Sequence, residues 1–138
     1  MIPRLLTVAL LLAYCAVTMP ACRSSSPTLE EKPSLVGVWN FQANGYKSEL
    51  VIQPDGRYSK HDQYGGMMTL IRGEISVTEE PAVLRLNIRD FDPKETCGPL
   101  GCDPIVMPAA ENYRFRLTAN ELVLTDERGQ SYSYSRTQ

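Results

Sequence analysis

Two cysteines five positions apart are the residues of this chain best suited to covalent chemistry. Cys97 and Cys102 enclose Gly-Pro-Leu-Gly, and two glycines with a proline permit the tight reversal that brings two Cβ atoms to bonding distance. We expect a disulfide between them. Because the enclosed loop is short, its entropic stabilisation lies at the modest end of the disulfide range, and its main effect is to fix the shape of the loop.

Redox and metal chemistry are both disfavoured at this pair. Thioredoxin-like sites use a closer CxxC pair at a helix N-terminus, and the sequence predicts no helix there. A zinc site would need two more ligands, yet the single histidine, His61, lies on a different strand-like segment. We therefore predict no metal site and no cofactor, and we interpret His61 as a solvated strand residue.

Nucleophilic catalysis has no recognisable motif in the sequence. No GxSxG turn occurs, and Ser131, Ser133 and Ser135 alternate on a predicted outer face. The acidic residues gather in turns, as at Glu79 and Glu80, or opposite basic residues, where solvation explains them. Because function must be argued from a site and none is assembled here, we predict that the protein is not an enzyme.

The charge balance disfavours nucleic-acid binding. The 138 residues carry a formal net charge of -2, so no basic field attracts phosphates. A local cationic set does exist, but alternating arginines on a strand are typical of its solvated face. Its members are Arg85, Arg89, Arg114 and Arg116.

The N-terminus has the three-part layout of an export signal. Arg4 precedes an apolar run from Leu5 to Met19, and Pro20 then interrupts it. A membrane-spanning helix needs about 20 apolar residues, so cleavage is the better interpretation, with residues 1–21 as a signal peptide. Whether the signal is cleaved and lipidated, simply cleaved, or kept as an anchor, it is expected to place the globular part outside the cytoplasm.

The residues Met19-Pro20-Ala21-Cys22 resemble the lipobox of bacterial lipoproteins. The resemblance implies that Cys22 receives a diacylglyceryl thioether and anchors the protein to the membrane, in the cell envelope and at the outer membrane. Lipidation also removes the odd thiol that a cut after Ala21 would leave in an oxidising compartment. Two alternatives remain, a simple secreted protein and an uncleaved N-terminal anchor.

The chain after the signal divides into a tether and one domain. Residues 22–33 are rich in Ser, Pro and charge and cannot bury enough surface to offset the ordering entropy, so they are predicted to be flexible. Residues 34–138 are enough for a single hydrophobic core.

Period-two alternation dominates this domain, and no window offers a helical stripe. The sequence therefore predicts an all-β fold. The eight expected strands are Leu35–Ala43, Tyr46–Gln53, Arg57–Gln63, Met67–Thr78, Ala82–Asp90, Asn112–Thr118, Glu121–Asp126 and Gln130–Arg136.

The connections favour an up-and-down antiparallel barrel. Strong turn residues such as Asn44-Gly45 and Pro54-Asp55-Gly56 join neighbouring strands, and only Phe91 to Ala110 is a long connection. Closing the sheet removes two edges that would invite aggregation. A sandwich is the alternative.

Bulky residues identify the inward face of each strand, and charged or polar residues the outward face. The inward set is Leu35, Trp39, Phe41, Tyr46, Leu50, Ile52, Ile71, Ile75, Val77, Leu84, Leu86, Ile88, Tyr113, Phe115, Leu117, Leu122, Leu124, Tyr132 and Tyr134.

Arg136 has the inward parity of Tyr132 and Tyr134 and so needs a partner. If the barrel closes, the first strand lies beside the last, and a guanidinium stacked on the Trp39 indole would satisfy it, a contact worth about 0.5 to 2 kcal/mol. Gly37-Val38-Trp39, the Pro54-Asp55-Gly56 hairpin and Tyr134-Ser135-Arg136 together resemble the lipocalin-like domains of bacterial lipoproteins. The resemblance implies that Trp39 and Arg136 close one end of the barrel.

Two functions then compete. A small apolar or amphipathic ligand would enter the barrel mouth between Tyr46, Met67, Met68, Leu70 and the long loop. Alternatively, residues 97–107 form a disulfide-pinned protrusion that contacts an envelope protein, in the manner of inhibitor-like barrels. A third interpretation makes this loop a lid over the barrel end. A ligand-sized cavity favours the first function, whereas a filled interior with the apolar loop in solvent favours the second.

Overall fold

A computed structural model of the chain describes residues 33–137. The predicted signal peptide (residues 1–21), the lipidation site Cys22 and the tether up to residue 32 lie outside the described residues. The described part of the chain is all-β, and within it no helix is long and apolar enough to cross a bilayer.

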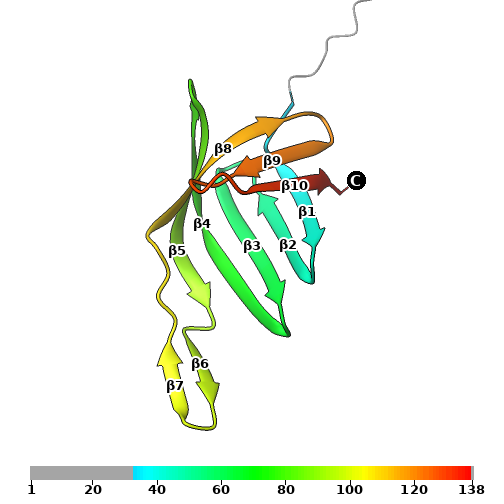
Figure 1. The fold of residues 1–138 in the computed structure, drawn as a ribbon. Helices are drawn as coiled ribbons and strands as arrows, with labels where there is room; N and C mark the ends of the chain where they lie inside the picture. Colours follow the sequence, from blue (N-terminus) through cyan, green and yellow to red (C-terminus); the bar gives the residue numbers. More distant parts are fainter. Residues whose placement is uncertain (1–32, 138) are drawn as a thin grey trace, which may run out of the picture. The chain divides into compact units, whose positions relative to one another are not determined.

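Eight antiparallel strands close into a barrel in the order β1-β10-β9-β8-β5-β4-β3-β2 (Figure 1). The predicted fold class is therefore confirmed, and the sandwich alternative is wrong. The barrel strands are β1 (Gly37–Ala43), β2 (Tyr46–Ile52), β3 (Arg57–Tyr64), β4 (Met67–Glu79), β5 (Ala82–Asp92), β8 (Ala110–Leu117), β9 (Glu121–Thr125) and β10 (Ser131–Arg136).

Two further strands lie within the long connection, which the sequence did not divide into strands. β6 (Glu95–Gly98) pairs with β7 (Gly101–Pro104) as a separate two-stranded sheet. Figure 1 shows this hairpin reaching away from the end of β5. All residues of both strands are exposed, so we call the segment Glu95–Pro104 the protruding hairpin.

A bulge in the β4–β5 pairing explains how β5 stays in the barrel beyond Ile88. Gly73 pairs with Ile88, but Arg72 pairs with Asp90, so Arg89 is the extra residue. A Cβ at Gly73 would lie 1.8 Å from the Asn87 carbonyl oxygen, and only glycine permits this approach. The bulge places Phe91 against the core after two exposed residues.

All residues of the predicted inward set except Tyr46 and Val77 belong to the observed core or pack against it, and the core also contains Tyr58, which the prediction left out. Buried residues come from every barrel strand except β8, whose Tyr113, Phe115 and Leu117 pack against them partly buried. Val77 was expected inside but is 43% exposed. The prediction fails because β3 begins at Arg57 opposite Glu74, so the last residues of β4 extend beyond β3. The buried core is Trp39, Leu50, Ile52, Tyr58, Ile71, Leu84, Leu86, Leu122, Leu124 and Tyr134.

The two ends of the barrel differ. One end, which we call the closed end, contains the start of β1, the end of β10 and the 118–120 turn, all held by Arg136. The other, which we call the mouth, is bordered by the Asn44-Gly45 turn, the Gly65-Gly66 turn and the 126–130 turn. The long connection that carries the protruding hairpin also leaves from the mouth, because β5 ends and β8 begins there.

Candidate functional site

The mouth contains a pocket of about 650 Å³, a volume within the range of small-molecule sites. Strands β1, β2, β3, β8 and β10 and the 126–130 turn supply its walls. The lining residues are Phe41, Ala43, Asn44, Tyr46, Lys60, Asp62, Tyr64, Glu111, Tyr113, Asp126, Arg128, Gln130, Tyr132 and Tyr134.

A buried lysine at this pocket is held by two carboxylates. Lys60 is 7% exposed, and its Nζ lies 3.1 Å from Asp62 Oδ2 and 3.5 Å from Glu111 Oε2. Asp62 is two residues further along β3, whereas Glu111 lies on β8. The ammonium therefore links two strands that are not neighbours in the barrel.

Hydroxyl groups complete a hydrogen-bonded network around these charges. Tyr113 Oη donates to Glu111 Oε2 at 2.9 Å, and Ser48 Oγ donates to Asp62 Oδ1 at 2.6 Å. Tyr134 Oη donates in turn to Ser48 Oγ at 3.0 Å. Burying a polar group costs free energy unless it is partnered in this way. We call the set Ser48, Lys60, Asp62, Glu111, Tyr113 and Tyr134 the internal polar network.

The electrostatics of the network keep its donors protonated. Burial disfavours the charge of Lys60, but the carboxylates of Glu111 and Asp62 outweigh burial and raise the pKa of Lys60 well above its ordinary value. Burial raises the pKa of Tyr113 and Tyr134 above the usual value for a phenol. The lysine is therefore a fixed cation and not a nucleophile at neutral pH.

One buried hydroxyl near this network has no partner. Tyr58 is 2% exposed, and its Oη lacks a hydrogen bond among the described residues. Burial raises the pKa of Tyr58 to about 12, with Glu111 adding to the rise and Lys60 opposing it. The hydroxyl is thus within electrostatic reach of both charged groups.

A group of aromatic rings lines the mouth. The Phe41 ring lies 5.9 Å from Tyr46, 5.6 Å from Tyr132 and 5.5 Å from Tyr134, measured between centroids, in tilted or edge arrangements. Such pairs add to the stability beyond their burial. These rings line the same pocket as Lys60, Asp62 and Glu111, so the pocket is amphipathic.

The four residues predicted to bind a ligand do not lie together. Tyr46 lines the mouth pocket. Met67 lies opposite Tyr64 at the rim and is 50% exposed. Met68 and Leu70 pair with Gln63 and His61 on the outer face, because their parity along β4 is opposite to that of Ile71. These two residues therefore do not line the mouth.

Sequence reasoning missed the internal polar network, although a signal was present. Lys60 and Asp62 share the parity of Tyr58 on β3, and Glu111 shares the parity of Tyr113 and Phe115 on β8. A charged residue with inward parity was recognised only at Arg136. Glu111 was missed because the strand was predicted to begin at Asn112, two residues after its observed start at Ala110.

At the closed end, Arg136 and Trp39 are in the predicted contact. The guanidinium carbon lies 4.2 Å from the centroid of the indole. Its nitrogens donate to the carbonyls of Ala119 and Val36, both at 2.8 Å, and to the carbonyl of Ser34. Trp39 Nε1 donates to Leu35 O at 2.8 Å. All three guanidinium nitrogens of Arg136 therefore donate hydrogen bonds that hold the closed end of the barrel.

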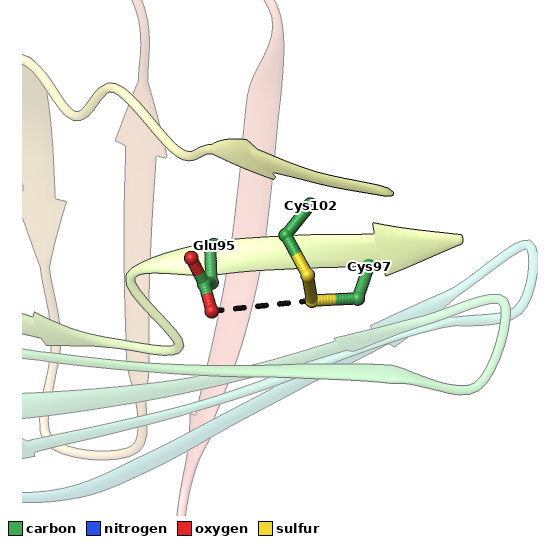
Figure 2. Close-up of side chains that lie close together, drawn as sticks. All are labelled: Glu95, Cys97 and Cys102. Atoms are coloured by element: carbon green, nitrogen blue, oxygen red, sulfur yellow. Dashed lines mark hydrogen bonds between the residues drawn. A yellow bond between two sulfur atoms is a disulfide. The ribbon is translucent and has the colours of Figure 1, made fainter. Parts of the chain in front are cut away.

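The predicted disulfide is confirmed in the protruding hairpin. Cys97 and Cys102 face each other across β6 and β7 and are bonded, with their Cα atoms 4.0 Å apart. Figure 2 shows Glu95 beside the bond, with its Oε1 at 4.0 Å from Cys97 Sγ. Because the sulfurs are bonded to each other, neither is a thiolate that could bind a metal together with Glu95.

The fold and the mouth define this protein as an eight-stranded closed barrel with an amphipathic pocket at one end. Comparison of the chain with protein-family models, with curated proteins and with solved structures finds no match. The resemblance to lipocalin-like lipoprotein domains therefore stays a prediction, based on the residues quoted above.

Proposed function

We propose that the protein binds a small amphipathic ligand in the mouth of the barrel. The observation that carries the proposal is the pocket of about 650 Å³ that is lined both by aromatic rings and by the charged side chains of Lys60, Asp62 and Glu111. Sites for small molecules are typically concave and apolar with a few convergent polar groups. The network of Lys60, Asp62 and Glu111 supplies such groups at fixed positions.

The ligand would occupy only the outer half of the barrel. Towards the closed end, Trp39, Leu50, Leu84, Leu86 and Leu122 are fully buried and fill the interior. An amphipathic molecule fits this shape better than a long apolar chain, because its polar group can reach the network while its apolar part contacts the rings of the mouth.

We also propose that the barrel works outside the cytoplasm, attached through a lipid on Cys22 to the outer membrane. This rests on the charged start, apolar run and lipobox-like residues of the N-terminus. Mass spectrometry of the mature N-terminus tests it. A diacylglycerol-modified Cys22 supports the anchor, whereas an unmodified residue there or an intact Met1 contradicts it.

A displacement experiment with a neutral apolar dye tests binding at the mouth. N-phenyl-1-naphthylamine becomes fluorescent in apolar surroundings, and we expect it to bind the protein. Tyr132→Arg places a long cation among the mouth rings and should weaken dye binding at least tenfold. Ser133→Arg is the matched control, because Ser133 is adjacent but on the exposed outer face. Equal dye binding by both variants would contradict the proposal, provided that their circular dichroism spectra match the parent.

Native mass spectrometry of the protein from its own cells addresses the natural ligand. A co-purifying small molecule that Tyr132→Arg fails to retain supports mouth binding. The same measurement reports on the second candidate function, contact with another protein.

The second candidate is contact with another protein through the disulfide-pinned loop of residues 97–107, which overlaps the protruding hairpin. Leu100 and Val106 are 104% and 89% exposed, and the lid interpretation fails for the hairpin itself, because its residues are all exposed. Only Met107, on the return to the barrel, packs against the core. A protein that co-purifies with the parent but not with Leu100→Ser/Val106→Ser would support this candidate, and unchanged co-purification would exclude it.

A further inference from the structure

The charges that line the mouth do not balance. The pocket contains two cationic and three carboxylate side chains. Arg128 pairs with Asp126 at 3.7 Å, which leaves Lys60 alone to neutralise both Asp62 and Glu111. Among the described residues of the pocket, one negative charge is therefore in excess. The Asp62 and Glu111 side chains are only 17% and 26% exposed, so water screens this charge less than it would at the surface.

The rings of the mouth favour the same sign of ligand charge. Six aromatic side chains line the pocket, and their faces carry the negative end of the ring quadrupole. The tilted and edge contacts of Phe41 with its neighbours bring four of these rings together. Aromatic rings grouped beside carboxylates attract a cation by both direct charge and quadrupole.

The hydrogen-bonding capacity of the site is biased towards acceptors. Each ionised carboxylate offers about four acceptor positions. Glu111 uses two of them in the internal polar network, and Asp62 uses two there and another with the Tyr46 hydroxyl. A ligand that donates N–H groups would satisfy the remaining acceptor positions, whereas a carboxylate or phosphate ligand would add a further acceptor and a second uncompensated negative charge.

We infer that the ligand of the mouth is an organic cation, a protonated amine carried on an apolar body. Its ammonium lies by Asp62 and Glu111, and its apolar part contacts the rings of Phe41 and Tyr132. Lys60 remains as the internal cation that holds the carboxylates in place. This inference rests on the proposed binding function and adds the charge of the ligand to it.

Isothermal titration of the protein with three probes of equal chain length tests the inference. The probes are n-octylammonium, octan-1-ol and octanoate, which share an apolar body and differ in charge. We expect octylammonium to bind about tenfold more tightly than octanol, and octanoate to bind more weakly than octanol. This comparison uses the unaltered protein and does not depend on the folding of any variant.

Two glutamate variants then locate the effect. Glu111→Gln removes one carboxylate charge from the mouth pocket and should weaken octylammonium binding about tenfold while changing octanol binding less than twofold. Glu74→Gln is the control, because Glu74 pairs with Arg89 on the exposed outer face, and it should change neither probe.

The outcomes separate the two proposals. If octanol or octanoate binds as tightly as octylammonium, or if Glu111→Gln leaves octylammonium binding unchanged, the inference of a cation is wrong and mouth binding still stands. If none of the three probes binds, the proposed function itself is contradicted.

Discussion

The ammonium of Lys60 lies 3.5 Å from the carboxylate of Glu111, although the two residues are 51 positions apart in the chain. This contact joins β3 to β8 through the interior of the barrel, since the two strands are not neighbours in the sheet. A buried pair of this kind contributes little net stability when complete, but removing one partner leaves a costly unpaired charge. The pair therefore supplies charged groups to the mouth pocket, and we expect the barrel to be sensitive to substitution of either residue.

Lys60→Met tests this directly. The substitution leaves Asp62 and Glu111 close together and without a cation, so we expect a loss of about 3 kcal/mol in the free energy of unfolding. Urea denaturation at neutral pH measures it. Lys47→Met is the control, because Lys47 is exposed on the outer face of β2, and it should change the stability by less than about 0.5 kcal/mol. Equal effects of the two variants would show that the internal polar network carries no such constraint.

Two tyrosine-to-phenylalanine variants should have opposite effects. Tyr58→Phe removes a buried hydroxyl that has no partner in the described structure, so we expect a gain of about 1 kcal/mol in the free energy of unfolding. Tyr134→Phe removes the donor of a hydrogen bond to Ser48 and should cost about 1 kcal/mol. Thermal or urea unfolding compares them. A loss of stability in Tyr58→Phe would mean that the hydroxyl is satisfied in solution.

The barrel could be predicted from the sequence because the patterns that specify its strands and turns each lie within a short stretch of the chain. Alternation of polar and apolar residues, together with turns such as Asn44-Gly45, fixes the faces and the hairpins within a few positions. Asn44 and Gly45 adopt φ values of 50° and 77°, as a tight hairpin requires. The contact of Arg136 with Trp39 could also be predicted. Arg136 has inward parity and needs a partner, and closure of the barrel puts the first strand, with Trp39, beside the last.

The mouth could not be predicted in the same way, because its geometry depends on distant segments. Lys60 and Glu111 look like ordinary surface charges until the register of β3 and the start of β8 are known. Met68 and Leu70 were predicted as ligand contacts because they are apolar. Their alternation with Ile71 along the strand instead assigns them to the outer face. The β6–β7 hairpin escaped prediction for another reason, since its residues are all exposed and so show no burial pattern.

Gly37 and Arg136 should show coupled effects on stability. Gly37 has a φ of 146°, and a Cβ there would lie 2.5 Å from a terminal nitrogen of Arg136. Gly37→Ala should therefore cost about 2 kcal/mol, and Arg136→Lys a similar amount, because the planar guanidinium donates to three carbonyls.

The double variant distinguishes a shared cause from two separate ones. In Arg136→Lys the clashing nitrogen is gone, so Gly37→Ala should cost less in that background, and the double variant should be more stable than the sum of the single effects predicts by about 1 kcal/mol. Strict additivity in urea denaturation would contradict a direct contact as the reason for glycine at this position.

Loss of the disulfide should loosen the protruding hairpin without destabilising the barrel. The strands β6 and β7 contain four residues each, all exposed, so they do not contribute to the barrel core. Cys97→Ser/Cys102→Ser should leave the free energy of barrel unfolding within about 0.5 kcal/mol of the parent. Amide hydrogen exchange should become faster in residues 95–104 and stay unchanged in β1 and β10. A large fall in global stability would instead make the hairpin part of the cooperative unit.

The stability of the barrel should fall steeply in alkaline solution. The pKa of Lys60 is raised well above 10.5, that of Tyr58 is raised to about 12, and those of Tyr46, Tyr113 and Tyr134 are also raised. In the unfolded chain these groups lose their protons at their ordinary pKa values of about 10 to 10.5, while the folded chain retains them. Their contribution is therefore complete below about pH 10 and is lost as the pH rises further.

Each such group should lower the free energy of unfolding by up to about 1.4 kcal/mol per pH unit above pH 10. Urea denaturation between about pH 8 and pH 11 measures this slope. Tyr113→Phe removes one of these groups. It should therefore reduce the slope by up to about 1.4 kcal/mol per pH unit, the contribution of one proton, whatever its effect on stability at neutral pH. If the stability of the parent protein stayed constant up to pH 11, these hydroxyl and ammonium groups would have to titrate in the folded barrel as they do in the unfolded chain. The internal polar network would then be open to water and could not hold the fixed charges on which recognition of a ligand at the mouth depends.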